Sequence, residues 1–573
     1  MAQTPAVPAD APASPVAASP DTPADAPDGK PNALPNVDLN SELLYKLTRA
    51  ELEFKNGQWQ GPYVTMMMAA QQTRDPRLAR RASEMALAAK QGGEALAAIR
   101  LWRELAPDSD EATQFFLGFV VLSDKIEEAE PIFAQRIAAA PPGSRGVALF
   151  QTQQILARAN DKLFAYAMLA RLMEPYLDMF EAHLVLAQGA LSIGERERAI
   201  AEANKALAIK PGSELSVLTL AQVTGEPQAA GQVLAAFLEK NPDAVEVRAA
   251  YARMLVEQKQ LEPARTQFLA LLKTQPDNVG ALYALGIVSL QLEDAKGAEQ
   301  YFKRFLAVLE KSPGEDRDPF KALMMLSQIA EARNDIPGAI AWLDKVDSST
   351  SGGYLDARLR RAQLMARSGD LDGARKTLAD TKVDDPAAQG QLLLVDAQLL
   401  RDGGYVQSAY TVLQNALVRF PDNPELLYDY ALLAERLDKL DLMEASLRRV
   451  MQIAPDNQHA YNALGYSLAE RNIRLPEALA LIERALQMAP GDPFIMDSMG
   501  WVQFRMGNLP AAEDALRRAY AVRPDPEIAV HLGEVLWQKG DKDEAQKLWR
   551  EAQGKDPKND ALKSTLARLN VSL

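Results

Sequence analysis

The feature that most constrains this chain is a phrase of about 34 residues that recurs along it. The copies are clearest towards the C-terminus, where a proline closes each one. In two adjacent copies a glycine is followed at similar spacing by an alanine and then by a large apolar residue. These positions are Gly465, Ala478 and Ile482 in one copy, Gly500, Ala512 and Leu516 in the next, and the closing prolines Pro421, Pro455, Pro490, Pro524 and Pro557.

Helix packing explains this spacing. Two antiparallel helices approach closely only where small residues meet, and larger side chains then fill the space beside them. A proline ends the second helix because it disfavours the helical conformation of the residue before it. Each copy therefore predicts two packed helices joined by a turn, and the repetition predicts a stack of such pairs.

The same pattern extends upstream, where the matching residues are Pro242, Ala252, Ala264, Phe268 and Pro276. These residues and those of the later copies resemble the tetratricopeptide repeat (TPR), a helix-turn-helix unit of similar length. The resemblance is strong from about residue 180 to residue 557 and weaker before that. It implies an all-α fold, a right-handed TPR superhelical solenoid of about fifteen antiparallel helix pairs.

We expect four parts along the chain. Residues 1–37 are almost all Ala, Pro, Asp, Ser and Thr, which predicts a disordered leader because such a segment buries too little apolar surface to fold. Residues 38–179 are expected to form degenerate N-terminal helical repeats, and residues 180–557 the TPR array. Residues 558–573 are expected to form a helix that caps the last pair.

Local signals give more detail. Helices are expected over 41–55 and 59–73, with Asn40 or Ser41 capping the first. Two polar segments rich in turn-forming residues, 311–319 and 347–353, interrupt the repeat pattern. We predict that these two segments are hinges.

Composition excludes several classes of function. The net charge of -14 offers no broad basic surface, so nucleic acid is not an expected partner. The chain has no cysteine, which removes disulfides, thiolate metal sites and cysteine nucleophiles. No apolar run approaches the roughly 18 residues of a membrane span, so no transmembrane segment is expected.

The sequence contains no pattern of catalytic residues. The three histidines, His183, His459 and His531, lie far apart and none has the spacing of a metal-binding motif. We interpret them as surface residues or as residues with ordinary hydrogen-bond partners. The chain is therefore predicted not to be an enzyme and to need no cofactor or metal.

The TPR resemblance implies a binding groove instead. In TPR proteins the first helices of successive pairs line a concave surface, at positions one residue after the glycine and three or six before it. Aromatic residues flanked by polar groups suit protein or peptide docking. The alternative is that Tyr466 and Trp501 fill the seam between neighbouring repeats. The predicted groove residues are Glu425, Tyr428, His459, Asn462, Tyr466, Phe494, Asp497 and Trp501.

Two phrases suggest a narrower resemblance. Asn-Ala-Leu-Gly-Tyr at 462–466 and Asp-Ser-Met-Gly-Trp at 497–501, with the Ala/Pro-rich leader and the length, resemble a subgroup of proteobacterial cell-envelope TPR proteins. The subgroup includes a periplasmic lipoprotein adaptor that activates a carboxyl-terminal processing protease and delivers peptidoglycan hydrolases to it. The resemblance implies a non-enzymatic adaptor with a protease and hydrolases as partners.

Two other functions stay open: a scaffold for polysaccharide export or outer-membrane assembly, and a cytosolic regulatory TPR protein. The expected location is the periplasm, either free or associated with the outer membrane. The alternative location is the cytoplasm. The start Ala2-Gln3-Thr4-Pro5 resembles the mature terminus of an exported protein. Lipid-anchored members of the subgroup carry a terminal cysteine, which this sequence lacks.

Overall fold

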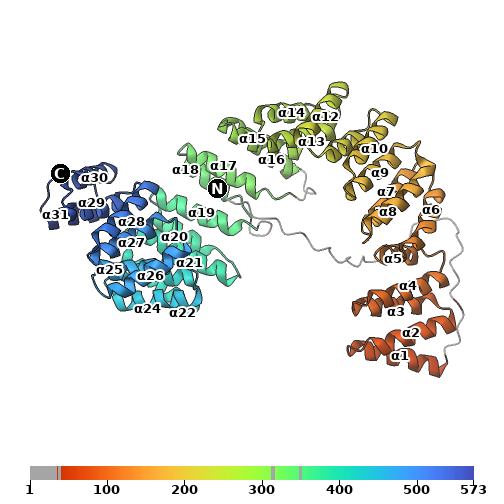
Figure 1. Ribbon diagram of the computed structural model, residues 1–573, viewed down its shortest axis with the longest axis horizontal. Coiled ribbons are helices and arrows are strands. Elements are labelled where there is room, and N and C mark those ends of the chain that lie inside the picture. The colour runs from red at the N-terminus through yellow and green to blue at the C-terminus, as the bar shows by residue number, and fades with distance from the viewer. Residues whose placement is uncertain (1–34, 36–39, 312–316, 348–351) are drawn as a thin grey trace. The chain divides into compact units, whose positions relative to one another are not determined.

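The structure is a computed structural model that describes residues 35, 40–311, 317–347 and 352–573. Within these ranges it contains 31 α-helices and no strand. Figure 1, coloured from red at the N-terminus to blue at the C-terminus, shows consecutive helices packed as pairs along the chain. The predicted all-α solenoid of paired helices is confirmed. The predicted leader, 1–37, lies outside the described residues apart from Pro35.

The chain divides into two compact units, residues 1–274 and 275–573. This division falls inside the predicted array of 180–557, and the expected boundaries at 37, 179 and 557 stay predictions. The described helices of the first unit are α1 (Ser41–Lys55), α2 (Gln60–Thr73), α3 (Pro76–Ala88), α4 (Gly92–Leu105), α5 (Asp110–Val120), α6 (Glu130–Ala139), α7 (Arg145–Leu156), α8 (Lys162–Met173), α9 (Phe180–Ser192), α10 (Arg196–Ile209), α11 (Glu214–Thr224), α12 (Pro227–Lys240), α13 (Val245–Glu257) and α14 (Leu261–Thr274), with 3-10 turns at Ile126–Ala129 and Glu174–Tyr176.

The second unit adds eight pairs and a final helix. Its described helices are α15 (Val279–Gln291), α16 (Ala295–Lys311), α17 (Phe320–Ala332), α18 (Ile336–Leu343), α19 (Tyr354–Arg367), α20 (Leu371–Asp380), α21 (Pro386–Asp402), α22 (Val406–Arg419), α23 (Pro424–Arg436), α24 (Leu440–Ile453), α25 (Gln458–Glu470), α26 (Leu475–Met488), α27 (Pro493–Arg505), α28 (Leu509–Val522), α29 (Pro526–Lys539), α30 (Lys542–Lys555) and α31 (Asp560–Leu569). Taken two at a time before α31, the helices give the fifteen pairs expected from the sequence.

Local sequence signals start and stop these helices. The Asn40 side chain accepts a hydrogen bond from the backbone N–H of Leu43 at 2.8 Å, so Asn40 caps α1 as expected. Asp and Asn caps also begin α23, α25, α27 and α29. The closing prolines each follow the end of a second helix by two residues, as at Pro490 after α26.

The glycines of the C-terminal repeats allow close helix contact. A Cβ atom placed on Gly500 would lie 2.5 Å from Leu516 Cγ and 3.1 Å from the Ala512 carbonyl oxygen. Gly465 has the same relation to Ile482 and Ala478, at 2.6 and 3.0 Å. These contacts confirm the register that the sequence predicted, because any side chain at these glycines would collide with the second helix.

The remaining sequence expectations concern the hinges and the last helix. The predicted hinges, 311–319 and 347–353, lie partly outside the described residues and stay predictions. Within the expected capping segment, α31 buries Leu562, and Arg568 contacts the carboxylate of Glu534 on α29 at 2.6 Å. This ion pair and the apolar contact hold α31 against the last pair.

Candidate functional site

The predicted groove residues lie on the first helices of three successive pairs, α23, α25 and α27, and α29 follows them in the next pair. Each of these helices begins with an Asn or Asp cap at an equivalent position, so equivalent residues recur one repeat apart. The eight predicted residues differ in exposure. Glu425, His459 and Phe494 are exposed, Tyr428, Asn462 and Tyr466 are half-buried, and Asp497 and Trp501 are buried.

Trp501 lies in the packed seam between three first helices. Only 4% of the residue is exposed. Its ring stacks on that of His531 on α29, with centroids 4.2 Å apart, and its indole N–H donates to Glu470 Oε2 on α25 at 2.7 Å. A Trp that links its neighbours in this way stabilises the stack. Its direct participation in docking stays a prediction.

A buried ion pair lies beside this tryptophan. Nδ1 of His531 is 2.9 Å from Oδ2 of Asp497, and both residues are more than nine-tenths buried. Burial lowers the pKa of His531, but the charge and hydrogen bond of Asp497, and then the charges of Glu527 and Glu470, raise it more, so the net shift is upward. The Tyr466 ring lies 6.1 Å from the same histidine.

Six residues from three helices form one unit, which we call the acidic-aromatic cluster: Tyr466, Glu470, Asp497, Trp501, Glu527 and His531. Sequence reasoning found three of them and missed Glu470, Glu527 and His531. The repeat contained the signal for Glu527, because it lies six residues before Gly533 just as Phe494 lies six before Gly500. Nothing in the sequence indicated that His531 would pair with Asp497, since that contact depends on neighbouring repeats.

The electrostatic field of the cluster is negative. The pKa of Tyr466 is raised, first by desolvation and then by the charges of Glu470, Glu527 and other carboxylates. Desolvation also raises the pKa of Glu527; the charge of His531 lowers it and the charges of neighbouring acidic residues raise it, with a net upward shift although the residue is exposed. Glu527 is therefore surrounded by protein and still in contact with water, which fits a position in a recess that solvent can reach. A cation placed here would relieve repulsion among these carboxylates.

The remaining predicted groove residues make different kinds of contact. The Tyr428 and His459 rings lie 6.4 Å apart and belong to neighbouring repeats. Phe494 lies under the Arg523 guanidinium group at 5.0 Å. Oδ1 of Asn462 is buried without a hydrogen-bond partner among the described residues. An unpaired buried acceptor is uncommon in proteins and would gain from an N–H donor.

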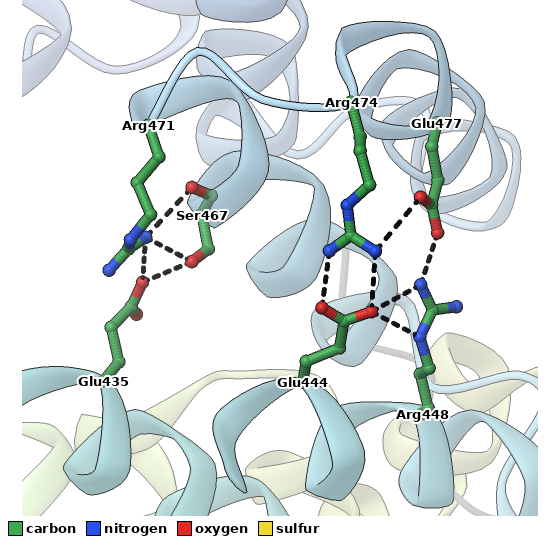
Figure 2. A network of polar contacts seen from close by, with 7 residues as sticks. All are labelled: Glu435, Glu444, Arg448, Ser467, Arg471, Arg474 and Glu477. Carbon is green, nitrogen blue, oxygen red and sulfur yellow. Dashed lines mark hydrogen bonds and ion pairs between the residues drawn. The ribbon is translucent and has the colours of Figure 1, made fainter. Parts of the chain in front are cut away.

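Ion pairs bridge the repeats that carry this face (Figure 2). Glu444 on α24 contacts Arg474, which precedes α26, and these contacts together with Arg448 lower its pKa to about 2. On the first helices, Glu435 of α23 accepts hydrogen bonds from Arg471 at 2.9 Å and from the Ser467 hydroxyl at 2.5 Å. The network ties α23 and α24 to the following pair.

No group of three or more His, Cys, Asp or Glu side chains that could hold a metal ion is present in the described part of the chain. His183 is buried and contacts Glu202 at 2.6 Å and the Leu177 carbonyl at 3.0 Å, as expected for a histidine with ordinary partners. Of the described helices, none is long and apolar enough to cross a membrane.

The paired helices and packed glycines define the class of protein. Family models of the tetratricopeptide repeat match residues 224–286, 440–493 and 498–560. These segments are TPR units, and the fold is an all-α TPR solenoid. Proteins built from such repeats are generally non-enzymatic scaffolds that bind proteins or peptides.

Two curated relatives are similar to parts of the chain. TPR repeat-containing protein PA4667 of Pseudomonas aeruginosa is 38% identical over 209 residues, which are 36% of this chain and 35% of the relative. Cellulose synthase operon protein C of Pseudomonas fluorescens is 25% identical over 327 residues, 54% of this chain and 24% of the relative. The matched segments therefore span about a third and a quarter of these relatives.

Solved structures of other TPR proteins are also similar to parts of the chain. A TPR protein of Thermus thermophilus is 24% identical, with 32% of this chain and 100% of that chain covered and a TM-score of 0.29. A TPR protein of Parabacteroides merdae is 16% identical, with 50% and 97% covered and a TM-score of 0.32.

Proposed function

We propose that this chain is a scaffold whose acidic-aromatic cluster docks a partner segment carrying a lysine or arginine. The observation that carries the proposal is that carboxylates, among them the exposed Glu470 and Glu527, surround the half-buried ring of Tyr466. Desolvation and then four carboxylates raise the pKa of Tyr466, and the carboxylate of Glu527 has no ion-pair partner among the described residues. A basic side chain between these two residues would gain both charge complementarity and a cation–π contact.

Neighbouring groups would hold the rest of such a segment. The side chain of Asn462 is half-buried on the same face and carries an amide, a group that can bond to a peptide backbone. Exposed Phe494 and half-buried Tyr428 offer apolar surface on the adjacent helices. The buried pair of Asp497 and His531 and the ring of Trp501 fix the first helices, so the site is held in place before a partner binds.

The partner that we propose is a carboxyl-terminal processing protease, together with the cell-wall hydrolases that it cleaves, and the proposed location is the periplasm. Support comes from the resemblance of the phrases at 462–466 and 497–501 to envelope adaptors of that kind. In this role the scaffold would hold protease and substrate close together, which raises their effective concentration without new catalytic groups.

Binding measurements with purified partners test this function. The full chain should bind such a protease, Tyr466→Ala should weaken binding about thirtyfold, and Glu527→Gln should weaken it less and in a salt-dependent way. Glu483→Gln is a matched control because Glu483 is an exposed carboxylate on α26. If the protease and hydrolases do not bind, the adaptor proposal is wrong. Equal affinity of all four proteins would move docking away from the cluster.

A second candidate is a scaffold for polysaccharide export. The similarity to cellulose synthase operon protein C favours it, since that match covers 54% of this chain. Affinity purification from envelope extracts would separate the two. Recovery of a polysaccharide synthase or secretion porin in place of a protease, with loss of that recovery in Tyr466→Ala, would favour the second candidate.

A further inference from the structure

We propose that a cleft between α5, α6 and α7 binds an acidic peptide segment of a partner protein. The cleft lies in the N-terminal unit, among helices that Figure 1 draws in orange, and is separate in sequence from the acidic-aromatic cluster. Its volume is about 580 Å³, which falls in the range of sites that take a few side chains. The inference does not depend on the function proposed above.

The lining of the cleft combines an apolar floor with positive and amide groups. The apolar part comes from Leu117, Phe133, Val147 and Ile155. The polar part includes Arg136, Arg158, Gln114, Gln151, Gln154 and Ser144. None of the lining residues is acidic, although the chain carries a net charge of -14. A cleft of this sign in an acidic protein favours an acidic occupant.

Both arginines are available to a ligand. The side chain of Arg158 has no hydrogen-bond or ion-pair partner among the described residues, and it is exposed. Arg136 has one contact, 3.7 Å from the carboxylate of Asp110, which is itself 87% exposed. An ion pair of that length between accessible groups contributes little. A carboxylate in the cleft would therefore displace water and not an established protein partner.

The surroundings of Gly118 show that no neighbouring helix packs into the space beside it. It lies within α5, where glycine costs about 1 kcal/mol relative to alanine. A Cβ atom on Gly118 would meet nothing within 4 Å, unlike the Cβ on Gly465 or Gly500. The absent side chain leaves room beside the cleft, because Gly118 is one of its lining residues.

This chemistry specifies the occupant. Arginine binds a carboxylate through charge-assisted hydrogen bonds, and two arginines at one cleft suit an Asp or Glu side chain. The glutamine amides and the Ser144 hydroxyl can bond to the backbone of an extended segment. The apolar floor can take an aliphatic residue next to the acidic one. The expected ligand is a short peptide in which Glu or Asp alternates with Leu or Val.

Fluorescence polarisation on the full chain tests the proposal with a labelled Gly-Leu-Glu-Leu-Glu-Gly peptide. A control peptide has glutamine in place of both glutamates. The acidic peptide should bind at least about tenfold more tightly, and more weakly as salt rises from about 50 to about 200 mM. Arg136→Ala combined with Arg158→Ala should remove this preference, whereas Arg253→Ala, an exposed arginine on α13, should leave it unchanged.

Substitutions at Gly118 test the cleft itself. Gly118→Leu should fill it and weaken peptide binding about tenfold or more, while Gly118→Ala should bind as the parent does. Circular dichroism should show unchanged helix content in both. Equal binding of the two peptides, no binding below about 1 mM, or full affinity in Gly118→Leu would overturn the proposal.

A deletion distinguishes an external partner from the chain itself. Residues 1–34 contain Asp10, Asp21, Asp25 and Asp28 with Lys30 as the one basic residue. If deleting these residues strengthens peptide binding more than about threefold, the chain's own N-terminal segment competes for the cleft and the external partner is wrong. Unchanged affinity supports an external partner.

Discussion

The pairs α25–α28 and α5–α8 show two uses of a glycine in a helix. In the first region Gly465 and Gly500 lie against the second helix of their own pair, and any side chain would collide there. In the second region the Cβ of Gly118 would meet nothing, and the residue lines an open cleft. The repeat glycines Gly465 and Gly500 therefore serve close helix packing, whereas Gly118, in the part of the chain where the pattern is weak, leaves space beside the proposed cleft.

The two regions also differ in charge. The C-terminal cluster surrounds Tyr466 with carboxylates, whereas the cleft beside α5 contains two arginines and no acidic residue. Surfaces of opposite sign select different partners, because each repels the segment that the other attracts. The two proposed sites would therefore take segments of opposite charge.

The largest expected effect separates buried from exposed aromatic residues in the C-terminal region. Trp501→Ala should lower the local stability of α25, α27 and α29 by about 3–5 kcal/mol, because it removes a buried ring and its hydrogen bond to Glu470. Phe494→Ala should cost much less, because Phe494 is 43% exposed. Amide hydrogen exchange resolved by helix measures both. Equal protection in the two variants would show that Trp501 is not part of the packed seam.

The second prediction compares Gly500, which packs against another helix, with Gly118, which lies beside open space. Gly500→Ala should destabilise α27 and α28 by about 1–3 kcal/mol through the collision with Leu516 and the Ala512 carbonyl. Gly118→Ala should instead stabilise α5 by about 0.5–1 kcal/mol, since it adds helix propensity without a collision. Urea denaturation followed by amide hydrogen exchange, resolved by helix, shows whether each substitution stabilises or destabilises its helix. A stabilising Gly500→Ala would contradict the assigned helix register.

A pH dependence should appear in the cluster. The raised pKa of His531 means that its contribution to stability is complete below about pH 6.5, the value in an unfolded chain, and is lost as pH rises through the higher folded value. The raised pKa of Glu527 acts in the same direction, because its ionised form is disfavoured in the folded state. Exchange in α27 and α29, corrected for intrinsic rates, should be slower at about pH 6 than at about pH 8.

Two comparisons control this measurement. In His531→Gln the difference between the two pH values should shrink, because the main titrating group is gone. Helix α5 contains no histidine and serves as an internal reference. A larger protection at the higher pH in the parent chain would mean that the ion pair with Asp497 does not stabilise the charged histidine.

The smallest expected effect concerns the network between repeats in Figure 2. Glu444→Gln should cost at most about 1 kcal/mol, because its partners Arg474 and Arg448 are both more than 40% exposed and solvent weakens their attraction. Helix-resolved exchange in α24 and α26 at low and high salt measures this. A loss of several kcal/mol that persists in high salt would show that packing, and not surface charge, is removed by the substitution.

The sequence determined the repeat and its internal register. The closing prolines and the small residues at 465, 478, 500 and 512 predicted which helices pair and where they touch, and these features are local enough to read from one chain. Asn40 likewise predicted the start of the first helix. Three of the six cluster residues followed from the TPR resemblance, since equivalent positions repeat.

Only the tertiary structure decided the contacts between repeats. Asp497 and His531 are 34 residues apart and became a buried pair because α27 and α29 pack side by side. The packing of Trp501 between Glu470 and His531 depends on three helices at once, so its burial was not fixed by its own repeat. The cleft beside Gly118 formed where the pattern was weakest. Repetition encodes contacts within a unit, whereas burial, charge and cavities arise from the neighbours that each unit meets.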